Sequence, residues 1–365
     1  MERQIKIVGV IHSLGIGGME QVMSSLLNHF SEKKNVQVDV ILIGRDREVA
    51  FPLNGSISVH KPPFEFNNKY RNYHTFKTLR FLRKKVKELS PDTVLGFGEM
   101  WNNLTLLALK GLRYPVYISD RSQPDKNLGK LHNYLRAKMY PTASGFIAQT
   151  SYAAQNANRN NWNHNIQVIG NPVKMVEPTP PADRENIVLS VGRLISTKHF
   201  DDLIQMFVQM NVPGWKLVII GGNAKKQDQL SDLKRLVAEL GAEDKVELTG
   251  KISNVGDHYK KASVFAFTSS SEGFPNVVGE ASAHGLPVVT YDCVAGPADI
   301  ITNNANGFLV KTHDHAAFKE KLGELMGNPS LRKSFAETAV EQIRKFSKEQ
   351  IAEQYYNFIT EKCES

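Results

Sequence analysis

Two glutamates and the turn between them are the residues whose types and spacing most clearly suggest chemistry. Glu272 and Glu280 lie in the segment EGFPNVVGE, with Pro275 between them. Carboxylates accept hydrogen bonds from hydroxyl groups. The first turn of a helix offers free N–H groups that favour phosphate. A ligand with both hydroxyls and phosphates, such as a sugar nucleotide, fits this combination. On spacing alone, two solvated glutamates beside an ordinary loop are an equally good reading.

The elements around these glutamates read as strand, loop, helix and strand. The apolar run at residues 264–267 predicts a short strand. Ser, Gly and Pro at 268–275 predict a loop, and Pro275 suits the first helical turn. Residues 286–291 predict a second strand. Ligands bind at the carboxyl ends of strands in parallel α/β sheets, so we expect Glu272 and the start of the helix to face a ligand.

The segment EGFPNVVGE resembles the E-x7-E signature of retaining GT-B glycosyltransferases, specifically the large family 4 group, the glycosyl transferases group 1. The resemblance implies that Glu272 holds hydroxyls of the donor sugar and that Glu280 holds the ribose hydroxyls of the nucleotide. The residues between them are then expected to bind the donor as well: Gly273, Phe274, Pro275, Asn276 and Val277.

A pair of cations follows another predicted strand. IVLSVG leads to Arg193 and Lys198 and then to a helical pattern. Two cations near a helix N-terminus suit a diphosphate; solvated surface charges are the alternative. The segment is similar to the family's V-G-R-L…K-G stretch, with His199 where glycine is usual. The resemblance implies that Arg193 and Lys198 stabilise the leaving diphosphate, so that the predicted catalytic residues are Arg193, Lys198 and Glu272. It also implies donor contacts at Gly192, Gly250 and Lys251.

A glycine-rich turn follows the first predicted strand, IKIVGVI. Gly17 and Gly18 allow a sharp turn and a close approach of a ligand, although their spacing does not match the G-x-G-x-x-G fingerprint. The turn is similar to the GG-x-E loop of family 4, which faces the donor phosphates and the acceptor. The resemblance therefore implies that Gly17 and Gly18 bind the donor and Glu20 the acceptor. A simple packing turn is the alternative.

Two further charges, Asp120 and Arg121, stand at the end of a predicted strand, PVYIS. The stretch resembles the S-E-H-S segment of family 4, in which a histidine often contacts the donor sugar or the acceptor. Here Arg121 replaces that histidine, and arginine cannot act as a base. This difference favours a charge-binding role, for example toward an acceptor phosphate. We assign Asp120 and Arg121 to the acceptor side.

The charge of the chain is uneven. The net charge is +8, but residues 1–171 hold 23 basic and 12 acidic residues, whereas the remainder holds 22 and 25. A predicted helix within the basic half has an apolar stripe, Phe76, Leu79, Leu82, Val86 and Leu89, beside many cations. This helix, around residues 76–89, is either a solvated surface helix or a contact to an anionic membrane surface. No nucleic-acid motif accompanies it.

Composition and motifs also limit the ligands that the protein could use and the compartment in which it could work. Hydrophobic content of 41% and charged content of 22% are ordinary for a soluble protein, and we find no apolar run of bilayer length and no signal peptide. The two cysteines give no metal motif, and no D-x-D triplet occurs. His313 and His315 flank Asp314, but a loop before a capped helix is the favoured reading. We therefore expect no metal and no other cofactor.

Alternating strands and helices in two halves argue for an α/β protein of GT-B type, with two Rossmann-like domains facing across a central cleft. The expected division is 1–171 for an acceptor-binding domain and 172–345 for a nucleotide-sugar-binding domain. Residues 346–365 are expected to form a terminal helix that returns to the first domain.

The resemblance implies a retaining, metal-independent hexosyl- or N-acetylhexosaminyltransferase that uses a nucleotide-sugar donor, most plausibly UDP-linked. The basic half suggests a polyprenyl-diphosphate-linked or other surface-glycan acceptor and a cytoplasmic enzyme peripheral on the inner membrane face. Three alternatives stay open: a sugar-nucleotide epimerase of the same fold, a transferase of soluble acceptors, and a non-catalytic sugar-nucleotide-binding subunit of a glycan assembly complex.

Overall fold

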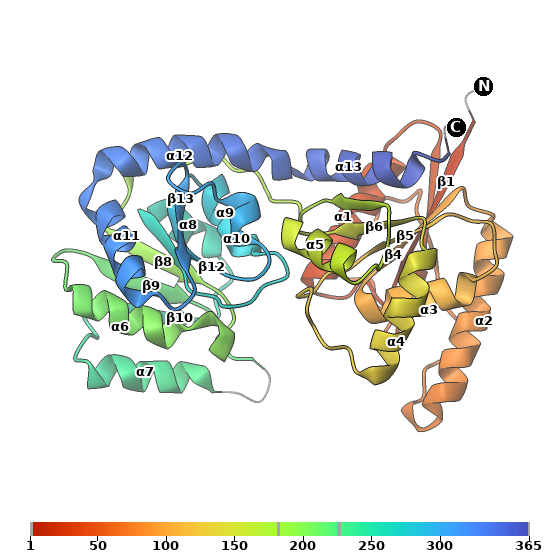
Figure 1. Cartoon of the computed structure of the whole chain (residues 1–365), viewed down its shortest axis with the longest axis horizontal. Coiled ribbons are helices and arrows are strands. Elements are labelled where there is room, and N and C mark those ends of the chain that lie inside the picture. The colour runs from red at the N-terminus through yellow and green to blue at the C-terminus, as the bar shows by residue number, and fades with distance from the viewer. Residues whose placement is uncertain (1–2, 181–182, 225–227, 364–365) are drawn as a thin grey trace. The chain divides into compact units, whose positions relative to one another are not determined.

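The computed structural model describes residues 3–180, 183–224 and 228–363. The chain forms two compact units, which are considered separately below. The first comprises Met1–Pro172 together with Lys348–Ser365, and the second comprises Val173–Ser347. Each unit is a parallel sheet covered by helices, as Figure 1 shows. The predicted α/β class with two Rossmann-like domains is confirmed.

The first unit contains, in its described residues, a seven-stranded parallel sheet of order β3-β2-β1-β4-β5-β6-β7. Its strands are β1 Ile5–Ile11, β2 Val36–Leu42, β3 Ser58–His60, β4 Thr93–Phe97, β5 Val116–Ser119, β6 Gly145–Ala148 and β7 Ile166–Val168. Its helices are α1 Gly18–Ser31, α2 Arg71–Leu89, α3 Glu99–Leu109, α4 Lys130–Met139 and α5 Ser151–Arg159, with α13 Lys348–Thr360 added from the far end of the chain. The strand order reverses between β1 and β4, and ligand crevices open at such switch points.

The second unit contains, where the structure describes it, a six-stranded parallel sheet of order β10-β9-β8-β11-β12-β13. Its strands are β8 Ile187–Val191, β9 Lys216–Ile220, β10 Val246–Gly250, β11 Val264–Phe267, β12 Val288–Asp292 and β13 Gly307–Lys311. Its helices are α6 Phe200–Met210, α7 Gln229–Glu239, α8 Val255–Lys261, α9 Asn276–Ala283, α10 Pro297–Ile300, α11 His315–Gly327 and α12 Pro329–Ile343. Here the switch point lies between β8 and β11.

Runs of Val, Ile and Leu form the strands because both faces of each parallel sheet are covered by helices. In β1, for example, Ile7, Val10 and Ile11 have no exposed surface. The stripe of α1 is buried from Val22 to Phe30 and packs on the sheet. Burial of this kind contributes roughly 25 cal/mol per Å² of apolar surface, which holds the strand ends and their loops in place.

The stripe predicted on α2 is only partly correct. Leu82 and Val86 are buried, but Phe76 is 57% exposed, while Phe81, expected off the stripe, packs against the core. Phe76 lies near the start of α2, ahead of Thr78, Leu82 and Val86, which are the buried residues of this helix. Among the described residues, no helix is long and apolar enough to cross a membrane.

Helix α13 packs on α1 and completes the first unit. Glu353 contacts His29 at 2.9 Å and Lys33 at 2.6 Å, both on α1. On another side of α13, the Phe358 ring meets Tyr117 of β5 edge-on, with centroids 5.2 Å apart. Polar and aromatic contacts within the first unit thus offset the conformational entropy that is lost when helix α13 becomes ordered.

Candidate functional site

The predicted catalytic residues of the second unit lie at its switch point. Arg193 and Lys198 follow β8, and Glu272 follows β11, the strand next to β8 in the sheet. Parallel strands put these carboxyl ends at the same edge, so the two sequence motifs meet there. This edge is where open α/β sheets bind their ligands.

Lys198 and Glu272 form a direct ion pair. The Lys198 Nζ lies 2.5 Å from Glu272 Oε1, and both side chains are mostly buried, with 13% and 15% of their surface exposed. The ammonium also lies 4.8 Å from the centroid of the Phe267 ring. Each charge is therefore neutralised by the other in a partly dry environment, where the interaction is stronger than at an exposed surface.

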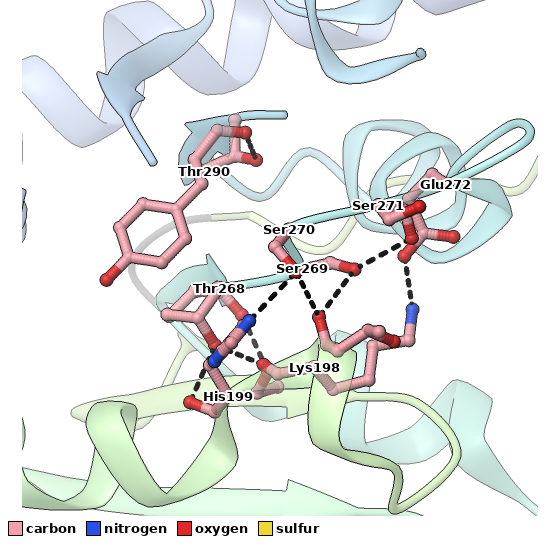
Figure 2. Close-up of polar contacts among 12 residues, drawn as sticks. Lys198, His199, Thr268, Ser269, Ser270, Ser271, Glu272 and Thr290 are labelled. Atoms are coloured by element: carbon pink, nitrogen blue, oxygen red, sulfur yellow. Dashed lines mark hydrogen bonds and ion pairs between the residues drawn. The ribbon is translucent and has the colours of Figure 1, made fainter. Parts of the chain in front are cut away.

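A network of hydroxyls joins the loop after β11 to the turn that carries Lys198 (Figure 2). The Thr268 hydroxyl donates to the carbonyl of Lys198 at 2.7 Å and lies 3.2 Å from that of His199. His199 Nε2 lies 2.8 Å from Ser270 Oγ. His199 has a φ of 49°, in the left-handed region that glycine adopts easily. Glycine, the residue that the family resemblance led us to expect here, adopts this φ without strain, whereas His199 adopts it with its side chain in contact with Ser270.

Arg193 is exposed and, in the described part of the chain, forms no hydrogen bond or ion pair. Gly192 beside it packs against the Lys198 side chain, since a methyl group there would lie 3.3 Å from Lys198 Cε. The ends of β8 and β9 also touch closely: a methyl group at Gly221 would lie 1.8 Å from the Gly192 carbonyl oxygen. Lys251 packs against Gly222 in the same way, directly after Gly250.

Glu280 is largely buried on α9 and accepts a hydrogen bond from the Tyr259 hydroxyl at 3.1 Å. Burial raises the pKa of Glu280, and the Tyr259 hydrogen bond partly offsets this rise. Tyr259 stacks on the ring of His284, with centroids 4.9 Å apart. The predicted helix start needs a small correction: α9 begins at Asn276, so Pro275 precedes the first turn as its N-cap.

Packing contacts hold the loop that carries Gly273 and Phe274 in place. Phe274 is buried against Phe346, with ring centroids 5.5 Å apart. Pro275 packs on Gly296, where a methyl group would lie 2.3 Å from Pro275 Cδ. Asn276 is exposed and Val277 half-buried at the start of α9. Nearby, burial and the Glu272 charge raise the pKa of Cys293 to about 12, which keeps this thiol protonated near neutral pH.

In the first unit, Glu20 folds back over the glycine turn at the switch point between β1 and β4. A methyl group at Gly17 would lie 2.2 Å from Glu20 Oε2, whereas one at Gly18 would meet nothing within 4 Å. His12 Nε2 lies 3.1 Å from Glu20 Oε1, and the His12 ring stacks on Trp101 with centroids 5.3 Å apart. Burial lowers the pKa of His12, and the Glu20 carboxylate partly offsets this effect.

Asp120 lies beyond β5 in a network of neutral hydrogen-bond donors. Its Oδ1 accepts from the Tyr140 hydroxyl at 2.6 Å and from Asn102 Nδ2 at 3.0 Å. Burial, together with the nearby Glu99 charge, raises the pKa of Asp120 to about 7. Asp120 is thus a group that titrates near neutral pH, rather than a fixed negative charge.

Arg121 is held inside the first unit. Its Nη1 donates to the Tyr355 hydroxyl of α13 at 3.1 Å, its Nη2 donates to Asn171 Oδ1, and its guanidinium lies 4.9 Å from the Phe97 ring centroid. Its backbone N–H donates to Glu99 Oε1. The remaining Nε–H is buried without a hydrogen-bond partner in the described residues. Arg121 therefore organises the end of β5 and has few donors left for a ligand.

Several contacting residues were missed by the sequence analysis. Tyr259 supports Glu280, and the pair His12 and Trp101 lies beside Glu20. Glu99, which the sequence already places at a strand end on the ligand side, accepts three hydrogen bonds from Arg121 and Ser122. His12 and Glu99 directly follow or adjoin strand ends, which is a usable signal. Tyr259 lies in an ordinary helix and carries no such signal.

Two family models match the chain. "Glycosyltransferase Family 4" matches residues 16–176, and "Glycosyl transferases group 1" matches residues 174–342. The lipopolysaccharide 1,6-galactosyltransferase of Escherichia coli is 30% identical over 83% of this chain and 84% of its own length. A Campylobacter jejuni α-1,4-N-acetyl-D-galactosaminyltransferase, whose name specifies a diNAcBac-PP-undecaprenol glycan, is 26% identical over 98% of this chain and 99% of its own length.

Solved structures share the fold over nearly the whole chain. The apo lipopolysaccharide outer core galactosyltransferase WaaB superposes with a TM-score of 0.82 at 22% identity, covering 98% of this chain and all of that chain. Anabaena HepE in complex with UDP gives a TM-score of 0.79 at 17% identity, with the same coverage. From the matched families and the relatives of similar length, we conclude that this chain belongs to the glycosyl transferases group 1, the family 4 glycosyltransferases with the GT-B fold.

Proposed function

We propose that this glycosyltransferase moves a sugar from a UDP-sugar to a lipid-linked or other surface-glycan precursor, with retention at the anomeric carbon. The proposal rests mainly on the ion pair between Lys198 and Glu272 at the switch point of the second unit, whose charged atoms lie 2.5 Å apart. The exposed Arg193 follows the same strand as Lys198. Cations and a carboxylate at one strand edge suit a ligand that has phosphates next to hydroxyls. The HepE complex with UDP and the galactosaminyltransferase named for a PP-undecaprenol glycan support the two substrate classes.

In this proposal, Lys198 and Glu272 exchange partners when the donor binds. The Lys198 ammonium moves toward the diphosphate, and the Glu272 oxygens accept from donor-sugar hydroxyls. Arg193 adds a second cation to the diphosphate. As the bond from the anomeric carbon to phosphate oxygen breaks, both cations stabilise the charge that develops on the leaving phosphate. Glu280, steadied by Tyr259, accepts from the ribose hydroxyls.

Retention follows if the acceptor attacks from the face that the phosphate leaves. The acceptor hydroxyl oxygen bonds to the anomeric carbon through an oxocarbenium-like state, and its proton passes to the leaving phosphate oxygen. This route requires neither an enzyme nucleophile nor a metal, and the protonated Cys293 beside Glu272 is consistent with it. The two cations supply the electrostatic stabilisation that a metal gives in other nucleotide-sugar enzymes.

On the acceptor side, we propose roles for Glu20, Asp120 and Arg121. Glu20 presents a carboxylate whose Oε1 lies 3.1 Å from His12 Nε2. Arg121 uses two donors on Tyr355 and Asn171. Its contribution is therefore to hold the end of β5 in place for the acceptor, more than to bind a phosphate directly.

We also propose that an aromatic and basic patch of the first unit contacts the anionic membrane surface. Tyr73 and Phe76 on α2 and Leu131 and Tyr134 on α4 are all more than half exposed. Burial and the charge of Arg71, the first residue of α2, lower the pKa of His132 near the start of α4, which indicates that the two helix starts are near each other. Exposed aromatics next to cations favour the interface of an anionic bilayer, where each basic residue contributes about 1 kcal/mol. This surface replaces the helix 76–89 stripe as the proposed contact.

The experiment that tests the function incubates the protein with a panel of labelled nucleotide sugars, with and without membrane lipid extract. Sugar transfer to extractable lipid only when lipid is present supports the proposal. An epimer or a free sugar formed without an acceptor supports the epimerase of the same fold. Transfer to a soluble glycan supports a soluble acceptor. Binding of a donor without any turnover supports a non-catalytic subunit. Each of the last three outcomes contradicts the proposal.

A further inference from the structure

Four side chains converge beside the donor edge of the second unit without forming normal hydrogen bonds to one another. His199 and Asp202 come from the start of α6, and His313 and His315 come from the turn before α11 and its first residue. The Asp202 Oδ2 lies 3.4 Å from His315 Nε2, 3.6 Å from His199 Nδ1 and 3.9 Å from His313 Nδ1. The ligating atoms of His199, Asp202 and His313 all lie within 4.8 Å of one another.

These separations match shared coordination better than hydrogen bonding. An N–H···O hydrogen bond spans about 2.7–3.2 Å. Two ligands of one tetrahedral zinc ion, each about 2.0–2.2 Å from the metal, are roughly 3.3–3.6 Å apart. The pairs from Asp202 to His315 and to His199 fall in that range, and His313 is only slightly further away.

The tautomer of His199 presents a lone pair to this cluster. The Ser270 Oγ lies 3.4 Å from the Thr197 carbonyl oxygen and 2.8 Å from His199 Nε2. We assign the tautomer in which His199 Nε2–H donates to Ser270 and the Ser270 hydroxyl points to the carbonyl. The Nδ1 of a neutral His199 then carries a lone pair that faces the Asp202 carboxylate. Two acceptors facing each other repel unless a proton or a cation lies between them. A histidine whose second nitrogen donates to a neighbouring oxygen is the usual arrangement in metal sites.

The surroundings are open enough for an ion to enter. His199 and Asp202 are about one-fifth exposed, and His313 and His315 are about half exposed. The His199 and His313 rings meet edge-on with centroids 4.6 Å apart, which holds both near Asp202. The Tyr291 ring lies 5.9 Å from that of His313, and its buried hydroxyl has no hydrogen-bond partner in the described residues.

We propose that His199, Asp202 and His313 bind one divalent transition-metal ion, for which Zn²⁺ is the best match, outside the sugar-transfer site. A water would complete the coordination, because His315, whose Nε2 lies 3.4 Å from Asp202 Oδ2, is not among the side chains whose ligating atoms all lie within 4.8 Å of one another. Two or three imidazoles with one carboxylate suit zinc, whereas Mg²⁺ and Ca²⁺ prefer oxygen ligands throughout. The sequence analysis favoured a loop before a capped helix for His313, Asp314 and His315. It did not see that His199 and Asp202, at the N-cap and in the first turn of α6, lie beside His313.

A metal at this position would brace the turn that carries Lys198. His199 follows Lys198 directly, and the Thr268 hydroxyl contacts the carbonyls of both. Binding itself does not depend on the proposed function, because it is measured without any substrate.

The test uses untagged, metal-free protein dialysed against Zn²⁺, followed by metal analysis of the protein. We expect one Zn²⁺ per chain at micromolar free zinc, and a rise in melting temperature with zinc. Co²⁺ in place of Zn²⁺ should give the intense visible absorption of a tetrahedral site. Asp202→Asn and His313→Asn should each weaken zinc binding at least tenfold and abolish the Co²⁺ spectrum.

The variants are chosen so that a folding defect is recognised. Asparagine tolerates the left-handed backbone of residue 313, where φ is 65°. His164→Ala removes an exposed histidine of the first unit and should bind zinc like the wild type. Circular dichroism of the metal-free variants checks that they are folded. No saturable zinc binding by the wild type, or equal binding by wild type and folded Asp202→Asn and His313→Asn, would overturn the proposal.

Discussion

Lys198 and Glu272 neutralise each other in the free protein, so removing one leaves the other partly buried without a partner. Arg193 differs, because it is exposed and has no partner in the described part of the chain. At the scale of single residues, the two cations should therefore contribute equally to turnover but unequally to stability.

For Arg193→Ala and Lys198→Ala, we expect turnover to fall on the order of 10²–10³-fold each, because each removes charge stabilisation of the leaving phosphate. Lys198→Ala should also lower the melting temperature, since it isolates Glu272, whereas Arg193→Ala should not. Steady-state kinetics and thermal unfolding measure both effects. Lys333→Ala, on the exposed face of α12, serves as the control. Near-normal turnover in both variants would refute the assigned roles.

Asp120 predicts a pH dependence of stability. Its folded pKa is about 7 against an ordinary value of 3.8. Between these values the folded state keeps a proton that the unfolded state has lost, so stability falls as pH rises from about 4 to 7. The amide of Asp120→Asn cannot ionise and still accepts from Tyr140 and Asn102. Between pH 5 and pH 8, the free energy of unfolding should fall by on the order of 2–4 kcal/mol less in this variant than in the wild type.

Urea unfolding at the two pH values measures this difference. The charged groups that act on Asp120 are Glu99 and Arg136. The change in unfolding free energy of the wild type with pH therefore also contains their contributions. Asp125→Asn, on the exposed loop that follows, is the control and should keep the pH dependence of the wild type. Equal slopes for the wild type and Asp120→Asn would contradict the shifted titration.

At the scale of elements, the two adjacent glycines at the start of α1 have different surroundings. A methyl group at Gly17 displaces the Glu20 carboxylate, and one at Gly18 meets nothing. Gly17→Ala should raise the KM for the acceptor about tenfold, which is the effect of losing one charged hydrogen bond of about 1.5 kcal/mol. Its melting temperature should change little, because Glu20 is flexible and the φ of Gly17 is −177°.

Gly18→Ala is the matched control. Gly18 lies at the first position of α1, where alanine is at least as favourable as glycine, so the acceptor KM and the stability of this variant should stay near those of the wild type. A Gly17→Ala protein with an unchanged acceptor KM would remove Glu20 from the acceptor side.

The elements were largely predictable from the sequence, but contacts between distant elements were not. Hydrophobic runs predicted β8 and β11, and strand-end logic placed Lys198 near Glu272. The contact of Tyr259 with Glu280, and that of His199 with His313, depend on how helices and loops pack around the sheet. Local periodicity carries no information about such packing. The prediction that Phe76 packs with the apolar stripe was wrong for a related reason. Phe76 has the helical spacing of the stripe, but the core does not extend to its turn of the helix.

At the scale of the whole molecule, the aromatic and basic patch predicts selective membrane association. Vesicles with anionic lipid should sediment the protein, neutral vesicles should not, and added salt should weaken the binding. Replacing Tyr73 and Phe76 with serine should reduce sedimentation severalfold, because their exposed rings supply the apolar part of the contact.

The control for this experiment is Leu240→Ser, a partly exposed apolar residue of the second unit. It should bind anionic vesicles like the wild type. Equal sedimentation with neutral and anionic vesicles would contradict the electrostatic part of the proposal.

The position of α13 has a consequence for how the protein is made. The Tyr355 hydroxyl holds Arg121, and Phe358 packs on Tyr117, yet both residues are encoded after the entire second unit. At about 5–20 residues per second, a ribosome needs roughly ten to thirty seconds to translate Val173–Ser347. During that interval the nascent first unit lacks its last helix and leaves the Tyr117 and Phe97 side uncovered. The first unit therefore cannot complete its native packing until the whole second unit has been translated.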